Sequence, residues 1–128
     1  MEFKTKTAVF SFDERGLIIV EFLANNEIFD AAEAHEHVRI GKVLAKNKTH
    51  PVLADITKSY HVPDAEAKRI LAEFEFKSAE AIVVATLAHK ILCNFYIKVL
   101  KTCNASYPVK VFMQKEKAIE WLLSQPNE

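Results

Sequence analysis

The chain has 128 residues, of which half are hydrophobic, and its 17 Lys and Arg residues balance its 17 Asp and Glu residues. This length buries the core of one globular domain, so we expect a single domain over residues 1–128. The balanced charge argues against nucleic acid and anionic membranes as partners. The two glycines, Gly16 and Gly41, are too few for a phosphate-binding loop, a dinucleotide-binding loop or a nucleophile elbow.

The chain carries no sign of export. No apolar run approaches the ~20 residues of a transmembrane helix, and the N-terminal segment Met1–Lys6 lacks the apolar region of a signal peptide. We therefore expect a cytoplasmic protein. Cys93 and Cys103 would lie roughly 15 Å apart along a continuous helix, which is too far for a disulfide, so we expect two reduced thiols.

The first half of the chain predicts a hairpin followed by a helix. Phe3–Phe12 and Leu17–Leu23 form two predicted strands, and Gly16 can adopt the left-handed conformation of the loop between them. Asp30–Glu33 is a capping box that begins the helix. Gly41 inside this helix costs about 1 kcal/mol relative to Ala, which indicates a close approach of the helix to the sheet.

Three strand–helix units follow the hairpin. Their ranges are His50–Ile56 with Pro63–Lys77, Ala81–Ala85 with Leu87–Thr102, and Val109–Met113 with Glu116–Ser124. Strands that alternate with helices indicate parallel crossovers. The predicted fold class is therefore α/β, with a mixed, mostly parallel sheet, an N-terminal antiparallel hairpin, flanking helices and the order ββαβαβαβα. Such sheets place ligand sites at the carboxyl ends of their strands.

The predicted helix Leu87–Thr102 has an apolar arc that is wider than one contact with a sheet requires. The residues of this arc are Ile91, Leu92, Phe95, Tyr96, Val99 and Leu100. Two interpretations remain open. Either the helix packs against the sheet and a neighbouring helix, or it forms a homodimer interface.

The loop after the third predicted strand holds the densest polar chemistry of the chain. Its candidate binding or phosphorylation residues are Asp55, Thr57, Lys58, Ser59, Tyr60 and His61. The loop precedes a helix N-terminus, which favours anions. Three interpretations remain open: Asp55 bonds local amides in an Asx turn, the loop contacts a protein partner or the carboxylate or phosphate of a ligand, or Thr57 or Ser59 carries a phosphate.

The next two loops add further candidates. Thr86 and His89 follow the fourth predicted strand, and Gln114 follows the last one. If the strands are parallel, these loops are neighbours, and His61 and His89 can converge as acid, base or anion ligand. The simpler expectations are that Thr86 caps a helix and that His89 is solvated.

The spacing of His, Asp, Glu and Ser residues gives little evidence for a metal site or a catalytic site. His35 and His37 lie about 200° apart around a helix. Glu33 and His37 have the right spacing but supply only two ligands, so we expect a surface ion pair. Ser59 and His61 suggest a nucleophile and its base, but no oxyanion hole is evident. We expect no catalytic residue, cofactor or metal, and no basic stripe for nucleic acid.

The order of elements resembles that of the STAS domain over essentially the whole chain. The local sequences that carry the resemblance are Ala54–Thr57, Asn94–Tyr96, Tyr107–Phe112 and Ala118–Leu122. The chain is most similar to bacterial STAS-like proteins related to the sporulation anti-sigma-factor antagonists. The resemblance implies a non-enzymatic cytosolic module that regulates or binds a protein partner.

In the antagonists, a strand ends at an Asp that is followed by a phosphorylatable Ser or Thr. Asp55 matches this Asp, but Thr57 comes one residue late, and the usual glycine is missing. The leading hypothesis is thus a STAS-like interaction module whose contact face is the loop Asp55–His61. The alternative is a domain that binds a small apolar or anionic ligand between sheet and helices, and an unrecognised small enzyme is the least favoured.

Overall fold

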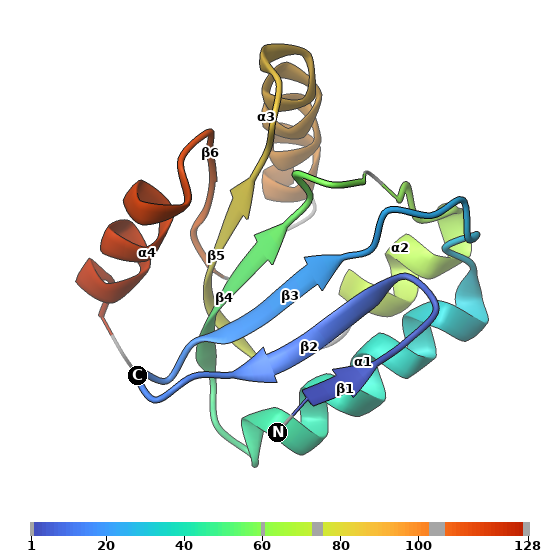
Figure 1. Ribbon diagram of the computed structural model, residues 1–128, viewed down its shortest axis with the longest axis horizontal. Helices are drawn as coiled ribbons and strands as arrows, with labels where there is room; N and C mark the ends of the chain where they lie inside the picture. Colours follow the sequence, from blue (N-terminus) through green and yellow to red (C-terminus); the bar gives the residue numbers. More distant parts are fainter. Residues whose placement is uncertain (1, 60, 73–75, 103–106, 127–128) are drawn as a thin grey trace.

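The computed structural model describes residues 2–59, 61–72, 76–102 and 107–126, and within α3 it does not describe the side chains of residue 96 and residues 99–102. It is an α/β structure in which four helices flank one six-stranded mixed sheet (Figure 1). The elements are β1 (Glu2–Lys4), β2 (Ala8–Phe12), β3 (Ile18–Phe22), α1 (Ala31–Ala45), β4 (His50–Asp55), α2 (Ala65–Ala72), β5 (Lys77–Val83), α3 (Leu87–Thr102), β6 (Val109–Phe112) and α4 (Lys115–Ser124). The predicted fold class is confirmed.

The predicted first strand, Phe3–Phe12, is wrong in one respect, because it divides into the antiparallel pair β1 and β2. The Oγ1 of Thr5 accepts hydrogen bonds from the amides of Thr7 and Ala8 at 3.3 and 3.1 Å. The Thr5 amide donates to the Ala8 carbonyl at 2.8 Å. A threonine side chain that bonds its own backbone in this way replaces ladder bonds and turns the chain. Three strands therefore precede the first helix instead of two.

The turn between β2 and β3 and the start of α1 form as expected. Gly16 has a φ of 87°, and the Asp13 carboxylate accepts from the amide of Leu17 at 3.0 Å. Asp30 caps α1 by accepting from the Glu33 amide at 3.0 Å. The second half of the predicted capping box is wrong, since the carboxylate of Glu33 lies in the core and bonds Thr7 instead of the Asp30 amide.

The six strands lie in the sheet in chain order. The pairs β1–β2 and β2–β3 are antiparallel, and the remaining three pairs are parallel. Because parallel crossovers are right-handed and every crossover here steps in the same direction, α1, α2 and α3 must cover the same face. The helix α4 follows the last strand and covers the opposite face, over β4–β6 (Figure 1).

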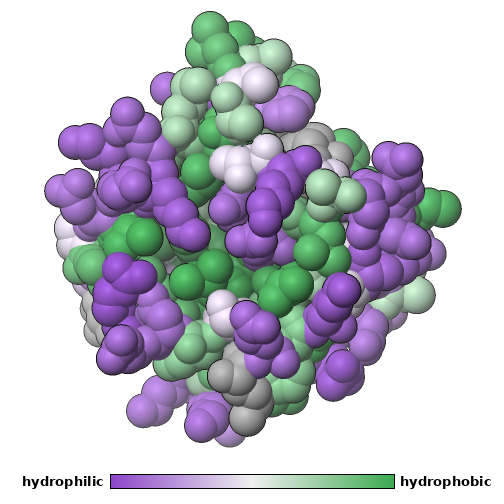
Figure 2. Space-filling view, in the orientation of Figure 1, coloured by the Kyte–Doolittle hydropathy of each residue, from purple (hydrophilic) through white to green (hydrophobic). Residues whose placement is uncertain are grey.

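The two faces have separate cores. On the α4 side, Ala118 and Leu122 pack against Leu53, Ala81 and Val83 of the central strands. On the other side, three clusters lie under α1, α2 and α3 and include large aromatic side chains, which are Phe10, Phe29 and Phe76. Figure 2 shows the α4 side, where apolar side chains gather between α4 and the N-terminal strands inside a polar rim. Among the described residues, no helix has the length and apolarity needed to cross a membrane.

Candidate functional site

A cavity of about 190 Å³ lies between the sheet and the three helices that share one face. Its apolar lining comes from Phe10, Val20, Phe22, Phe29, Val38, Val52, Ala54, Ile56, Pro63, Leu71, Ala72, Phe76, Ile82 and Cys93. Its polar lining comes from His37, His61, Lys68, Lys77, Glu80 and Tyr107. A mainly apolar hollow with a few polar groups is the usual form of a small-molecule site.

The hollow does not lie at a reversal of the strand order. Open α/β sheets bind ligands in the crevice where the strand order reverses, and in this sheet the order does not reverse. The loops after β4, β5 and β6 are neighbours, as predicted, because Asp55 pairs with Val83 and Val83 with Phe112. The cavity reaches this carboxyl edge at Ile56 and His61 and continues under the helices.

His37 of α1 lies in the cavity wall among aromatic rings. Its ring centroid is 4.8 Å from that of Phe10, 4.6 Å from that of Phe29 and 5.8 Å from that of Phe22. Its Nε2 lies 2.9 Å from Oγ1 of Thr7 and 3.2 Å from Oε2 of Glu33. Since a carboxylate oxygen only accepts, Nε2 carries the proton of the neutral ring.

The Glu33 carboxylate beneath His37 is buried and well bonded. It accepts from the amide of Thr7 at 3.0 Å and from the hydroxyl of the same residue. Burial acts to raise the pKa of Glu33, but hydrogen bonds from Thr5 and Thr7 and the charge of His37 outweigh it and lower that pKa. The expected surface ion pair between Glu33 and His37 is therefore wrong in its placement, because both side chains are buried.

Burial also sets the protonation of His37. Desolvation lowers the pKa of His37 to about 4, although the charge and hydrogen bond of Glu33 act to raise it. The imidazole is thus neutral near pH 7, with Nε2 bound to Thr7 and Glu33. This ring gives the cavity one polar group in an otherwise aromatic wall.

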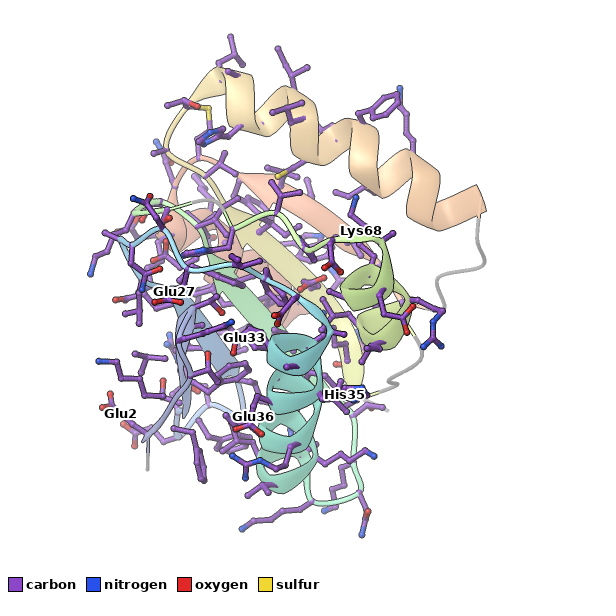
Figure 3. The ribbon with its side chains drawn as sticks, turned by 90° about the vertical axis from the view of Figure 1, so that its right-hand side faces the viewer. Glu2, Glu27, Glu33, His35, Glu36 and Lys68 are labelled. Atoms are coloured by element: carbon purple, nitrogen blue, oxygen red, sulfur yellow. The ribbon has the colours of Figure 1, made fainter. Side chains whose placement is uncertain are left out.

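The polar groups at the cavity edge carry the charge. Lys77 forms an ion pair with Glu80 at 2.9 Å, and both side chains are largely buried. The Nζ of Lys77 lies 5.7 Å from the ring centroid of Tyr107, and burial raises the pKa of that phenol. Lys68 lies on the side of α2 toward α3, and Glu33 on the side of α1 toward the strands (Figure 3).

The predicted loop candidates Asp55, Thr57 and Lys58 lie outside the cavity lining. Asp55 is buried, and its Oδ1 accepts from the amide of Thr57 at 2.9 Å and from the Thr57 hydroxyl at 2.6 Å. This is the Asx turn that the sequence suggested. The Lys58 Nζ lies 2.9 Å from the Glu21 carboxylate, and this hydrogen bond raises the pKa of Lys58. The side chain of Thr57 is exposed.

His61 is the loop candidate that lines the cavity, and it also holds two loops together. Its Nδ1 lies 3.0 Å from the carbonyl oxygen of Glu27, and its Nε2 lies 2.9 Å from that of Leu23. Its ring lies 5.9 Å from that of Phe22. The hydroxyl of Ser59 makes a long contact of 3.5 Å to the Asn25 carbonyl. Candidate Tyr60 lies outside the described residues.

The remaining candidate residues lie at the N-terminal ends of helices. Thr86 caps α3, since its Oγ1 accepts from the amide of His89 at 3.1 Å. Asp64 caps α2 by accepting from the Ala67 amide at 2.9 Å, so a carboxylate already occupies the helix N-terminus that was expected to attract anions. Both nitrogens of His61 bond the segment before α1, whereas His89 lies in the first turn of α3.

The outer face of α3 is apolar and uncovered. Leu87, Ile91, Leu92 and Phe95 are between 55 and 69% exposed, whereas Cys93 and Ile97 are buried against the sheet. Figure 2 shows apolar side chains where α3 projects from the body. The expected contacts of Tyr96, Val99 and Leu100, and the thiol of Cys103, lie outside what the structure describes.

Sequence reasoning placed Glu33 and His37 at the surface and missed Thr7. Within the described ranges, no three His, Cys, Asp or Glu side chains form a group that could hold a metal ion. A signal for burial was nevertheless present. Glu33 and His37 are in line with Ile40 and Leu44 at spacings of four, three and four residues, which is the stripe that α1 buries.

The family model described as a domain of unknown function, DUF7793, matches residues 10–125. The chain belongs to this family. No curated protein matches the chain. A crystal structure of a protein with unknown function from Arthrobacter sp. FB24 is similar at 19% sequence identity and a TM-score of 0.33, over 91% of this chain and 99% of the other. The matched family region includes the cavity lining.

Proposed function

We propose that this protein is a small-molecule binding domain whose ligand occupies the cavity under α1, α2 and α3. The observation that carries the proposal is the hollow of about 190 Å³ itself, which has fourteen apolar lining residues and six polar ones. Well-packed interiors hold few voids larger than a water molecule. A partly open, mainly apolar hollow of this size leaves apolar side chains in contact with water, so a ligand that fills it stabilises the fold.

The volume limits the ligand. An apolar cavity of about 150 Å³ in another protein binds benzene, so the present cavity has room for a molecule of roughly 8–12 non-hydrogen atoms. The aromatic rings around His37 suit a ring or a branched chain. The imidazole supplies one polar contact inside.

The first test is binding of neutral apolar probes. Toluene, indole and hexanol are added to the protein, and thermal unfolding and amide chemical shifts are measured. Ligand linkage requires Tm to rise with probe concentration. Shift changes are expected at Phe22, Ala54, Leu71 and Cys93, which line the cavity.

A filled cavity provides the control. Ala54→Leu adds side-chain volume where β4 lines the hollow, and it should abolish the probe-induced rise in Tm while the fold is kept. Ala85→Leu places the same side chain at an exposed position that does not line the cavity. Equal probe binding by the Ala54→Leu variant, or no binding by the natural chain, would contradict the proposal.

We propose as a second candidate the STAS-like interaction module, because α3 presents four large apolar side chains outward. Each exposes on the order of 100 Å², so they offer roughly 400 Å² per copy, about half of one side of a standard interface. The partner that we propose for this face of α3 is a second copy of this chain. An apolar patch of this size is within the range of the largest patch on a typical monomer, and such patches are often functional.

Light scattering of the eluted protein tests the second candidate. The combined change Ile91→Glu and Phe95→Glu should convert a dimer into a monomer, whereas Leu123→Glu on α4 changes an equally exposed leucine and should not. A monomer at all concentrations would contradict it. Phosphate mapping by mass spectrometry tests Thr57 and Ser59 separately, and an unmodified loop would remove the switch from the STAS-like proposal.

A further inference from the structure

The two nitrogens of the neutral His37 ring have different roles. Nε2 lies 2.9 Å from Oγ1 of Thr7 and 3.2 Å from Oε2 of Glu33. The Thr7 hydroxyl donates its single proton to that carboxylate oxygen, so both oxygens are left to accept from Nε2. The ring proton is therefore on Nε2, and Nδ1 keeps its lone pair as a hydrogen-bond acceptor.

This acceptor is buried and lies within reach of the cavity. The His37 side chain is only 7% exposed, and its ring lines the hollow. Within the described residues, Nδ1 has no hydrogen-bond partner, yet protein atoms do not fully enclose it. A buried acceptor without a partner costs free energy. A ligand that donates a hydrogen bond to Nδ1 removes this cost, whereas a purely apolar ligand does not.

The surroundings of the ring strengthen such a hydrogen bond. The ring centroids of Phe10, Phe22 and Phe29 lie 4.6 to 5.8 Å from that of His37. A low local dielectric makes a hydrogen bond stronger and an unpaired polar group more costly. The Glu33 carboxylate at Nε2 also polarises the imidazole, which makes Nδ1 a better acceptor.

We infer that the ligand of this cavity has an aromatic or branched apolar body and one N–H or O–H group that donates to Nδ1 of His37. This inference rests on the proposed function, since it names the class of molecule bound at the same site. Two other polar groups of the lining already contact the protein, because His61 lies against two backbone carbonyls and Glu80 pairs with Lys77. Phenols and indoles have the required form.

Matched ligands test the acceptor. Indole is compared with indene, and p-cresol with p-xylene, by titration calorimetry. The members of each pair are nearly the same in shape, and only the first donates a hydrogen bond. We expect indole and p-cresol to bind about fivefold more tightly than their partners. Anisole, whose oxygen only accepts, should bind less tightly than ethylbenzene, because that oxygen would be buried without a donor.

The natural chain offers a direct measurement that needs no variant. Isotope labelling of the histidine nitrogens lets NMR distinguish a ring nitrogen that carries a proton from one that does not. At neutral pH, we expect the His37 proton on Nε2. Indole should then move the Nδ1 resonance, and indene should move it far less. A proton on Nδ1 would overturn the inference.

A variant tests whether His37 is the group that selects the donor. His37→Phe removes the acceptor and keeps a ring in the aromatic wall. Indole should then bind about fivefold less tightly than indene, because its N–H is buried without an acceptor. His35→Phe makes the same change at an exposed position of α1 and should keep the preference for indole. If His37→Phe keeps that preference as well, the inference is overturned.

The outcomes separate this inference from the proposed function. If indene and p-xylene bind as tightly as indole and p-cresol, the donor assignment falls and a purely apolar ligand remains for the same cavity. If all four of these probes fail to bind, the cavity is not a binding site and both proposals fall.

Discussion

The two faces of the sheet are packed in different ways. On the α4 side, the small side chains Ala79, Ala81 and Ala118 let one helix approach the strands closely, and Leu53 and Leu122 fill the remaining space. On the opposite side, three helices span the sheet over large aromatic side chains, and a hollow of about 190 Å³ remains between these helices and the sheet. The α4 side is closely packed, whereas the opposite side contains a hollow.

This difference would allow a single sheet to separate stability from the ligand binding that we propose. Close packing is worth several kcal/mol per large side chain and tolerates little change. A face with a hollow gives up part of that energy, and polar groups such as His37 and Glu33 can be kept there. The α4 side can therefore hold the fold while the other side accommodates the proposed ligand.

The largest expected difference in unfolding free energy between the two faces comes from shortening one leucine on each of them. Leu122→Ala removes a fully buried side chain from the α4 side and should cost about 3 kcal/mol of unfolding free energy. Leu71→Ala shortens a half-buried side chain that already borders the hollow and should cost roughly 1 kcal/mol. Urea unfolding measures both. Equal costs would mean that both faces are packed alike.

The pH dependence of stability should sharpen the comparison next, because the buried titratable pair lies on the cavity side alone. The pKa of His37 is lowered from 6.5 to about 4, so the unfolded state binds this proton first as pH falls. The contribution is fully present above pH 6.5 and is lost toward pH 4, by about 3 kcal/mol. The lowered pKa of Glu33 acts in the same direction below about pH 4.5.

His37→Phe should flatten the stability profile between pH 6.5 and 4 while the loss at lower pH persists. His35→Phe changes an exposed histidine on the same helix and serves as the control. Urea unfolding at half-unit pH steps measures the profiles. A natural chain whose stability rises as pH falls through this window would show that His37 is charged in the folded state.

The helix caps give the smallest expected effects. Asp30→Ala removes the cap of α1 and should cost about 1 kcal/mol. Gln114 stands at the N-cap of α4 without a side-chain cap bond, so Gln114→Ser should stabilise by up to about 1 kcal/mol. Thermal unfolding measures both. A neutral Asp30→Ala variant would mean that packing alone positions the first turn of α1.

Turns and helix caps could be predicted from the sequence where a single residue type determines them. Gly16, the cap at Asp30 and the Asx turn at Asp55 follow from side-chain types and their immediate neighbours. The turn at Thr5 was missed because threonine also suits strands, so nothing local favours the turn. His37 was expected at the surface because titratable residues are mostly exposed, and its burial depends on packing against the rings of Phe10, Phe22 and Phe29.

The cavity itself could not be predicted, because its size depends on how the three helices pack on the sheet. That packing results from side-chain volumes on several elements at once, and no single segment encodes it. The contacts of His61 are with two carbonyl oxygens more than thirty residues away in the chain. Such contacts become visible only when the sheet is assembled.

The chain-order arrangement of the strands also bears on how the protein folds. Every new strand joins the edge that the preceding strand has just made, so no segment needs to insert between two paired strands. The hairpins at the N-terminus close short loops at small entropic cost. The three later crossovers are longer, are similar in length to one another, and each closes onto the existing edge. The sheet can therefore grow in one direction, from the first hairpin to the last strand.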